Sequence, residues 1–332
     1  MSRKAHIAIA IGDPAGIGPE IALKAALDST VRAACDPILV GEANLLERHA
    51  VACGITVTLR AVARVGDADW SDDRINVLNC ARPAAIPLGA VSAGAGRASI
   101  AFCAAAIEAA LHGEVDAVAA APQNETSIAR AGIAFDGHPS FVARQTGTDP
   151  DDVFMMLCCG DMKIAHVTLH RSVRDAIALI TCERVERTIH AADAALRRLG
   201  VARPNIAVSG LNPHAGEGGL FGAEEIEIVK PAIGAAAASG ISVTGPFGAD
   251  IMFHMKGFDA FVVMLHDQGH IAAKLLAPNA AVALSIGSPI LFASVAHGTG
   301  HDIAGKGVAN PAAMIDAILR LSRAQRSMSA AK

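Results

Sequence analysis

Strand-like and helix-like segments alternate along almost the whole of this 332-residue chain. Residues 6–12 (HIAIAIG) are a short apolar run typical of a buried strand, and residues 19–29 follow as a predicted helix with Pro19 and Glu20 in its first turn. Further strands are predicted at 37–42, 115–122, 163–170, 205–212, 260–266, 281–287 and 289–295, and further helices at 42–54, 96–113, 185–200 and 222–233. This alternation predicts an α/β fold with largely parallel sheets covered by helices.

Composition limits the partners. The chain has 28 Lys and Arg against 32 Asp and Glu, a formal net charge of −4, and the charges are dispersed. Aromatic residues make up only 3% of the chain, and Tyr is absent. The basic patches and base-stacking platforms of nucleic-acid-binding proteins are therefore missing, and we expect no nucleic-acid partner.

The apolar segments do not predict a membrane protein. Gly, Pro or charged residues interrupt each run before it reaches the roughly 20 residues that span a bilayer. The N-terminal MSRKAHIAIAIGDPAG is typical of a strand and turn rather than a signal peptide. Seven Cys residues without a CxxC pair are typical of reduced thiols. We therefore expect a cytoplasmic protein with no membrane partner.

Three histidines follow predicted strands, where ligands of open α/β sheets bind. His170 ends one strand, His214 lies just past another, and His266 ends a third. Three imidazoles that converge can bind one divalent metal and leave positions open for substrate. Each histidine alone is more often structural or exposed, and His166 competes with His170 because strand alternation puts both on one face.

Two glycine-rich segments also follow strands. Residues 12–20 (GDPAGIGPE) match neither a GxGxxG fingerprint nor a Walker loop, and predict either a tight turn or an anion site at a helix N-terminus. Residues 297–311 (HGTGHDIAGKGVANP) combine glycines with Asp302, which can bind a sugar diol, and Asn310, which can contact a base edge. The alternative for this second segment is a solvent-exposed loop.

Lys274 lies eight residues after His266, and Asp250 and Asp267 flank the same region. Lys274 can bind a substrate anion or move a proton, and either Asp can act as a base or orient a histidine. Surface ion pairs and loop caps are the alternatives for all three residues.

The chain contains six blocks that together are more specific than any single motif: GDPAGIGPE, AGIAFDGHPSF, LNPHAGEGGLFG, GADIMF, MLHDQGHIAAK and SVAHGTGHDIAGKG. They resemble the 4-hydroxythreonine-4-phosphate dehydrogenase family of vitamin B6 synthesis nearly from end to end. The resemblance implies an isopropylmalate/isocitrate dehydrogenase-like α/β fold, with two α/β/α lobes and a cleft between them. One lobe is expected from 1–128 plus 288–332, and the other, with the metal ligands and dimer contacts, from 129–287.

The same resemblance implies ligands. His170, His214 and His266 fall on the family's three metal-ligand positions, two from one subunit and the third from its partner in a homodimer. Zn is the expected metal, and Mn, Co, Ni or Fe also suit three imidazoles.

Residues 297–311 resemble the adenosine-binding loop of isopropylmalate and isocitrate dehydrogenases, which implies cofactor contacts at His297, Gly298, Asp302 and Asn310. NAD is expected rather than NADP, because the Asp302 carboxylate suits a free ribose 2′-hydroxyl and repels a 2′-phosphate.

Departures from the family concern the substrate. Members that act on phosphorylated threonine derivatives have Arg where this chain has Phe292 and Asn where it has Ala283, both near the substrate. They also have Lys and Thr at the positions of Glu125 and Pro139. An apolar ring and an acid in place of two cations disfavour a phosphate dianion.

A second branch, the terephthalate cis-dihydrodiol dehydrogenases, resembles the chain more closely, through ETSIARAGIAF, HVTLHRSVR, MLHDQGHIAAKLLAPN and HGTGHDIAGKGVA. This branch implies NAD- and metal-dependent oxidation of a secondary alcohol β to a carboxylate, then decarboxylation to a catechol acid such as protocatechuate. Lys274 is expected to contact the substrate carboxylate or donate a proton, His138 to orient the substrate, and Asp250 or Asp267 to transfer a proton. The alternatives are a 4-hydroxythreonine-4-phosphate or phospho-sugar-acid dehydrogenase, a phosphotransacetylase-like acyl transferase, and a silent NAD- or metal-binding protein.

Overall fold

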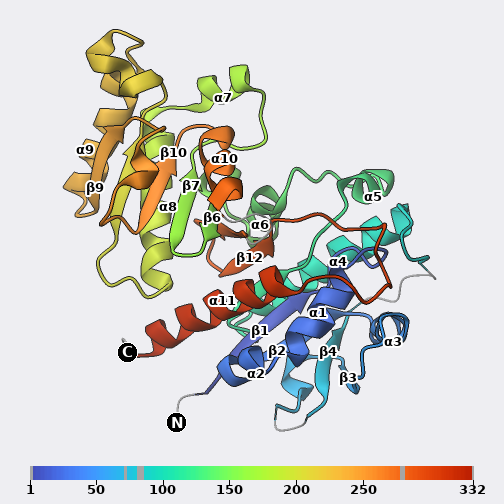
Figure 1. The fold of residues 1–332 in the computed structure, drawn as a ribbon. Helices are drawn as coiled ribbons and strands as arrows, with labels where there is room; N and C mark the ends of the chain where they lie inside the picture. The colour runs from blue at the N-terminus through green and yellow to red at the C-terminus, as the bar shows by residue number, and fades with distance from the viewer. Residues whose placement is uncertain (1–2, 71–72, 81–85, 277–280, 331–332) are drawn as a thin grey trace. The chain divides into compact units, whose positions relative to one another are not determined.

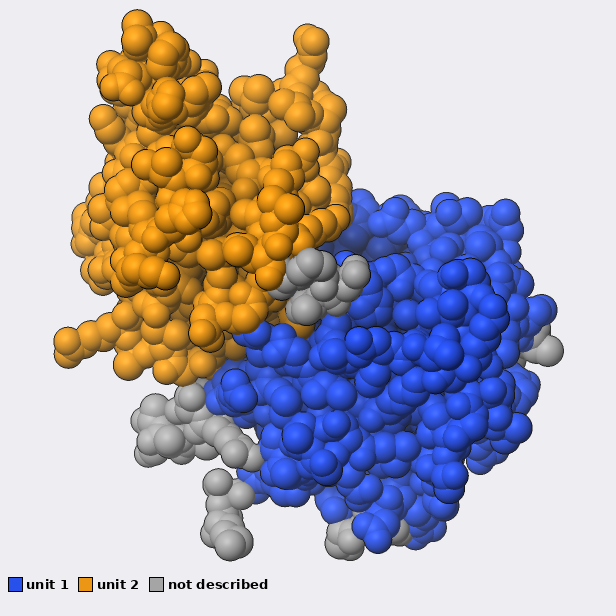
Figure 2. Space-filling model, in the orientation of Figure 1, with its two compact units in different colours: residues 1–146, 289–332 blue, residues 147–288 orange. Residues whose placement is uncertain are grey.

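A parallel sheet forms the centre of the unit that contains both chain termini. The computed structural model describes residues 3–70, 73–80, 86–276 and 281–330. They divide into two compact units, residues 1–146 with 289–332 and residues 147–288 (Figure 2). Residues 129–146, which the sequence analysis assigns to the second lobe, group here with the termini.

In the first unit, the strand order is β3-β4-β2-β1-β5-β12, and every neighbouring pair is parallel (Figure 1). The strands are β1 (Ala5–Ala10), β2 (Cys35–Gly41), β3 (Leu59–Val62), β4 (Ile75–Asn79), β5 (Ala117–Ala120) and β12 (Phe292–Val295). The helices are α1 (Gly18–Leu27), α2 (Ser29–Ala34), α3 (Ala43–Ala52), α4 (Ala93–Leu111), α5 (Glu125–Arg130), α6 (His138–Thr146) and α11 (Ala312–Ala330). The α/β class predicted from the alternating segments is confirmed.

Strand alternation gives this sheet two buried faces. Ala8 and Ala10 of β1 pack in one cluster with Cys103 and Ile107 of α4, together with Phe292 of β12. The intervening residues of β1 point to the opposite face and are also buried. Helix α4 is long and apolar enough to cross a membrane, but half of its apolar window is buried in this unit, and we interpret it as a core helix.

The second unit departs from the predicted parallel arrangement. Its strand order is β11-β6-β7-β10-β8-β9, in which the β11–β6 and β6–β7 pairs are antiparallel. Its strands are β6 (Phe154–Cys159), β7 (Met162–His166), β8 (Asn205–Ser209), β9 (Ser242–Phe247), β10 (Ala260–Val263) and β11 (Val282–Ile286). The sequence pattern predicts neither β6 nor β9 in this unit, and neither β3 nor β4 in the first unit. The two-residue Gly160-Asp161 link between apolar runs is nevertheless a hairpin signal for β6.

Helices pack against the strands of the second unit. The helices of this unit are α7 (Val173–Leu179), α8 (Cys182–Arg198), α9 (Lys230–Ala238) and α10 (His266–Leu276). The helix predicted at 222–233 is a π-helical turn (Glu225–Val229) that runs into α9. The strand predicted at 163–170 ends at His166, so His170 lies in the turn beyond β7.

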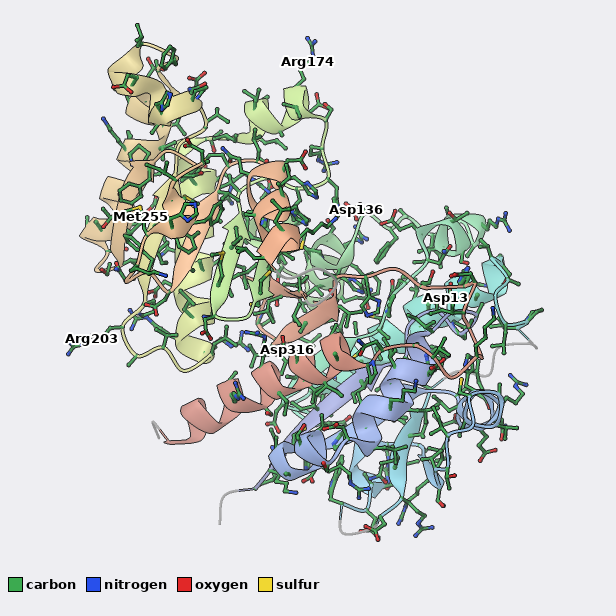
Figure 3. All side chains as sticks on the ribbon, in the orientation of Figure 1. Asp13, Asp136, Arg174, Arg203, Met255 and Asp316 are labelled. Carbon is green, nitrogen blue, oxygen red and sulfur yellow. The ribbon has the colours of Figure 1, made fainter. Side chains whose placement is uncertain are left out.

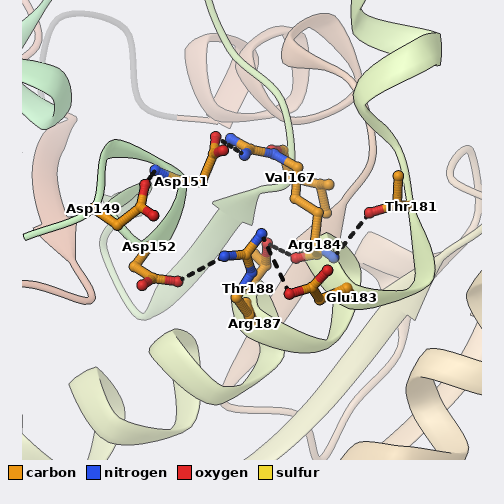
Figure 4. Close-up of polar contacts among 9 residues, drawn as sticks. All are labelled: Asp149, Asp151, Asp152, Val167, Thr181, Glu183, Arg184, Arg187 and Thr188. Atoms are coloured by element: carbon orange, nitrogen blue, oxygen red, sulfur yellow. Dashed lines mark hydrogen bonds and ion pairs between the residues drawn. The ribbon is translucent and has the colours of Figure 1, made fainter.

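Charged contacts fix the segment after β7 to α8 (Figure 4). Arg184 donates to the Val167 carbonyl at 2.9 Å and pairs with Asp151 at 2.6 Å. Arg187 pairs with Asp152 at 3.2 Å. The Arg184–Val167 hydrogen bond holds the backbone three residues before His170, and the two ion pairs join α8 to the turn at Pro150–Asp152 before β6.

Candidate functional site

The turn after β1 anchors the glycine-rich loop at residues 297–311. Ile17 donates its backbone N–H to the Thr299 carbonyl at 2.8 Å, and His301 Nε2 lies 3.3 Å from Asp13 Oδ2. Asp13, labelled in Figure 3, is fully buried, and burial raises the pKa of its carboxyl above the usual range. The turn therefore supports the loop from within the same unit.

An ion pair between half-buried Lys24 and buried Glu20 holds the far end of this loop. Lys24 Nζ donates to Glu20 Oε1 at 2.7 Å and to the carbonyls of Gly307 and Ala309 at 2.9 and 2.8 Å. Glu20 in turn accepts from Ala309 N at 2.8 Å and from Cys53 Sγ at 3.3 Å. Gly307 has φ +74°, and a Cβ there would lie 2.6 Å from the Cys53 carbonyl oxygen, so packing alone requires a glycine.

The four predicted cofactor-binding residues have different surroundings. His297 is half-buried, and its buried Nε2 has no hydrogen-bond partner. Gly298 has open space where a Cβ would stand, and Asp302 is exposed. Asn310 accepts from Ala312 N at 2.9 Å, so its carbonyl oxygen caps the start of α11. An unsatisfied imidazole nitrogen and a free carboxylate suit a polar ligand such as a nucleotide, whereas Asn310 already has a structural role.

His138 and Phe292 lie together in the first unit. Their ring centroids are 5.5 Å apart, and Phe135 contacts the same imidazole edge-on at 5.7 Å. Phe292 is 1% exposed. The buried Nε2 of His138 has no partner, and burial lowers the pKa of the imidazole to about 4. Of the two other departures from the family, Glu125 is exposed in the first turn of α5 and Pro139 is half-buried in the first turn of α6.

Two predicted metal ligands meet in the second unit. The imidazole centroids of His170 and His266 are 5.7 Å apart, and His270 stacks on His266 at 3.7 Å. Asp267 lies 2.7 Å from Nδ1 of His266, which leaves Nε2 for another ligand. Lys274 is exposed two turns further along α10.

His214 lies apart from this pair. Within the described residues, no group of three or more His, Cys, Asp or Glu side chains is close enough to hold a metal ion. His214 instead lines a pocket with Asp250 and Gln268, among Leu211, Asn212, Pro213 and Ala249. One chain therefore brings His170 and His266 together. It places Asp250, one of the two candidate acids, beside His214.

Gln268 is a site residue that the sequence analysis missed. Its Oε1 accepts from the backbone N–H groups of Met264 and Leu265 at 3.0 and 2.9 Å, and its Nε2 donates to the Gly210 carbonyl at 3.1 Å. It thus fixes the start of α10 to the segment before His214. Its position three residues into the helix was the available signal, because Gln there reaches back to the helix start. Ala283, in β11, is buried in the core of the same unit.

Known proteins resemble the chain over nearly its full length. The family model described as pyridoxal phosphate biosynthetic protein PdxA matches residues 33–320. A 1,2-dihydroxy-3,5-cyclohexadiene-1,4-dicarboxylate dehydrogenase from Comamonas sp is 44% identical, with 95% of this chain and 96% of that protein covered.

Two solved structures extend the comparison. A 4-hydroxythreonine-4-phosphate dehydrogenase from Klebsiella pneumoniae has a TM-score of 0.87 at 39% identity, over 97% of this chain and 98% of that one. A terephthalate 1,2-cis-dihydrodiol dehydrogenase from Burkholderia xenovorans LB400 has a TM-score of 0.72 at 42% identity, with the same coverage.

Proposed function

Because this chain belongs to the family of the pyridoxal phosphate biosynthetic protein PdxA, we propose that it is a dehydrogenase that oxidises a carboxylated cyclohexadiene cis-diol with NAD. The secondary alcohol lies β to a carboxylate, so its oxidation gives a β-keto acid that loses carbon dioxide. For a terephthalate-type diol, the product is a catechol acid such as protocatechuate. The contact between Phe292 and His138 carries this proposal.

Charge at this contact supports a diol over a phosphate ester as the substrate. The family resemblance implies an Arg at the position of Phe292 in phosphate-using members, and a phosphate dianion needs such charge-assisted partners. Here the ring is apolar and buried, and His138, with a pKa of about 4, is neutral at pH 7. A neutral imidazole with an unpartnered Nε2 suits a hydroxyl group, which can donate or accept a hydrogen bond.

We propose that His170 and His266 bind one divalent metal together with His214 of a second copy of the chain. The donor set fits, because imidazole nitrogens suit Zn, Mn, Co, Ni or Fe, and Asp267 orients His266 with Nε2 free. The bound metal supplies Lewis acidity to an alcohol oxygen. The separate location of His214 supports a homodimer with sites shared between subunits.

We propose that NAD occupies the loop at residues 297–311. His297 offers an unpartnered nitrogen, and exposed Asp302 offers a carboxylate to a ribose diol. The Glu20–Lys24 pair keeps the end of the loop in place. Exposed Lys274 contacts the substrate carboxylate or donates a proton, and Asp250 or Asp267 transfers the proton of the alcohol.

The test is NADH formation by the purified protein with added divalent metals, with the terephthalate cis-dihydrodiol and with phosphorylated 4-hydroxythreonine as substrates. We expect turnover of the dihydrodiol, with protocatechuate as the product. Turnover of the phosphorylated compound alone would establish the alternative dehydrogenase function. Acyl transfer between coenzyme A and phosphate, without NADH formation, would establish the acyl transferase alternative.

A further inference from the structure

A left-handed turn presents His214. Residues 214–218 all have positive φ, and three of them are not glycine: His214 (φ 53°, ψ 30°), Ala215 (φ 51°, ψ 45°) and Glu217 (φ 43°, ψ 51°). Left-handed backbone is unfavourable for residues with a Cβ, and it persists only where surrounding contacts impose it. Some part of the unit must therefore hold this turn.

Glu225 provides the contacts at the base of the turn. Its Oε1 accepts from the backbone N–H groups of Leu211 and Asn212, each at 2.7 Å, and its Oε2 accepts from Asn212 Nδ2 at 3.0 Å. The residue is 1% exposed. One carboxylate therefore receives three hydrogen bonds from the two residues that begin the segment leading to His214.

Two glycines make room for this carboxylate. A Cβ on Gly216 would lie 2.5 Å from Glu225 Oε2, and a Cβ on Gly210 would lie 2.9 Å from Oε1. The chain before the turn and the middle of the turn thus both press against Glu225. A larger residue at either position would displace the carboxylate or the backbone.

The surroundings of Glu225 keep it charged. Although burial opposes ionisation, hydrogen bonds from Asn212 and Leu211 hold the pKa of this carboxyl below its usual range. Glu225 begins the π-helical turn Glu225–Val229, an irregularity that is frequent at functional sites. The ionised form accepts all three hydrogen bonds without a donor of its own.

We propose that Glu225 is the positioning residue that holds the left-handed turn and so aims the imidazole of His214 at its ligand. This inference rests on the proposed function, in which His214 is a metal ligand. Partners of metal ligands that act through hydrogen bonds typically change metal affinity about 10- to 100-fold when they are mutated. Glu225 acts one step further away, through the backbone that carries His214.

The test compares Glu225→Gln with Glu227→Gln in the full-length protein. Gln at 225 keeps the size of the side chain but turns one acceptor into a donor, which opposes the Asn212 amide. Glu227 is an exposed acid of the same π-helical turn and serves as the matched control. Hydrogen exchange over residues 211–218 measures the hold on the turn, and calorimetric titration with Zn²⁺ measures metal affinity.

We expect the amides of Leu211 and Asn212 to exchange faster in Glu225→Gln, and Zn²⁺ to bind up to about tenfold more weakly, with neither change in Glu227→Gln. If hydrogen exchange is unchanged in Glu225→Gln, Glu225 does not hold the turn. If exchange is faster but the affinity for Zn²⁺ is unchanged, Glu225 does not aim His214. A wild-type protein that binds no Zn²⁺, Mn²⁺ or Co²⁺ would refute the metal site itself and with it the aiming role. Exchange would then decide whether Glu225 holds the turn.

If Glu225→Gln fails to fold, Asn212→Ala gives the comparison without changing a residue of the left-handed turn. The substitution removes the amide that donates to Oε2 and leaves the carboxylate chemically intact. We expect the same two changes, and the same null results would overturn the proposal.

Discussion

The imidazole of His138 lies 5.5 Å from the ring of Phe292, centroid to centroid, and both rings belong to the unit that contains the chain termini. The contact packs the neutral imidazole of His138 against a buried apolar ring, at the position where the family resemblance implies an Arg in phosphate-using members. We derive two predictions from this contact, one about the pH dependence of stability and one about the choice of ligand.

Acid should destabilise the protein through His138. The folded state holds this imidazole neutral with a pKa of about 4, against an ordinary value of 6.5. Between these pH values the unfolded chain binds more protons, so stability is full above pH 6.5 and falls as the pH drops toward 4. We expect His138 to contribute a loss of about 2 kcal/mol in the free energy of unfolding between pH 7.5 and pH 5.

Urea unfolding at the two pH values measures this loss, and His138→Gln should lose less stability than the wild type by that amount. Exposed His112 is the control, because His112→Gln should keep the wild-type dependence. An unchanged dependence in His138→Gln would mean that other groups cause the acid sensitivity. His166 and His270, with pKa values lowered to about 3 and 4 by burial, are the first of these.

A cation at position 292 should favour a phosphorylated ligand. Phe292→Arg buries a charge in an apolar cluster and should lower the free energy of unfolding by about 3–5 kcal/mol, the cost typical of an uncompensated buried charge. Phosphorylated 4-hydroxythreonine should offset part of this loss by pairing with the guanidinium. Thermal unfolding with and without the ligand checks the prediction, with Phe292→Leu as the uncharged control. Equal ligand-induced shifts of Tm in Phe292→Arg, Phe292→Leu and the wild type would remove the charge argument for the substrate.

The sequence predicts eight of the twelve described strands and does not predict β3, β4, β6 or β9. Continuous apolar runs bounded by Gly and Pro locate the other parallel strands to within a few residues, whereas β3 and the Gly-Pro-containing β9 are only partly buried and have no such run. The antiparallel β6–β7 hairpin was missed because its apolar residues fill both faces and show no alternation, although Gly160-Asp161 marks the turn. His170 was predicted on the strand face that His166 occupies, and the strand ends before His170.

The residues that hold the candidate site in place could not be predicted from the local sequence pattern. Glu20 and Glu225 look like ordinary helical acids, and what distinguishes them is burial against backbone groups of other segments. The Glu20 carboxylate accepts from Ala309, 289 residues away. Glu225 accepts from the backbone N–H groups of Asn212 and Leu211, which lie 13 and 14 positions earlier. The left-handed turn lies between them, and its glycines are its only signal in the sequence. The convergence of His170, His214 and His266 on one metal also stays a prediction, because it requires His214 from a second copy of the chain.

Removing the charge of Lys24 should loosen the loop at residues 297–311, where we propose that NAD binds. In Lys24→Met, the carbonyls of Gly307 and Ala309 lose a donor, and the buried Glu20 carboxylate loses its ionic partner. We expect the free energy of unfolding to fall by about 3 kcal/mol, and the KM for NAD to rise more than kcat falls. Steady-state kinetics and urea unfolding check the two effects. Exposed Lys306 lies in the same loop and is the control, so an equal rise in KM in Lys306→Met would point to general charge attraction instead.

Two inactive variants should complement each other if sites are shared between subunits. His170→Ala and His214→Ala each remove one proposed ligand from every site of a homodimer. In a mixed dimer, one site loses both ligands, and the other keeps His170 and His266 from one subunit and His214 from its partner. Random exchange makes half of the dimers mixed, so the mixture should recover about one quarter of wild-type activity.

The measurement is NADH formation after co-refolding of equal amounts of the two variants. A mixture of His170→Ala with His266→Ala is the control and should stay inactive, because these ligands belong to the same half of the site. Recovery in the control, or none in the test mixture, would contradict a site shared in this way.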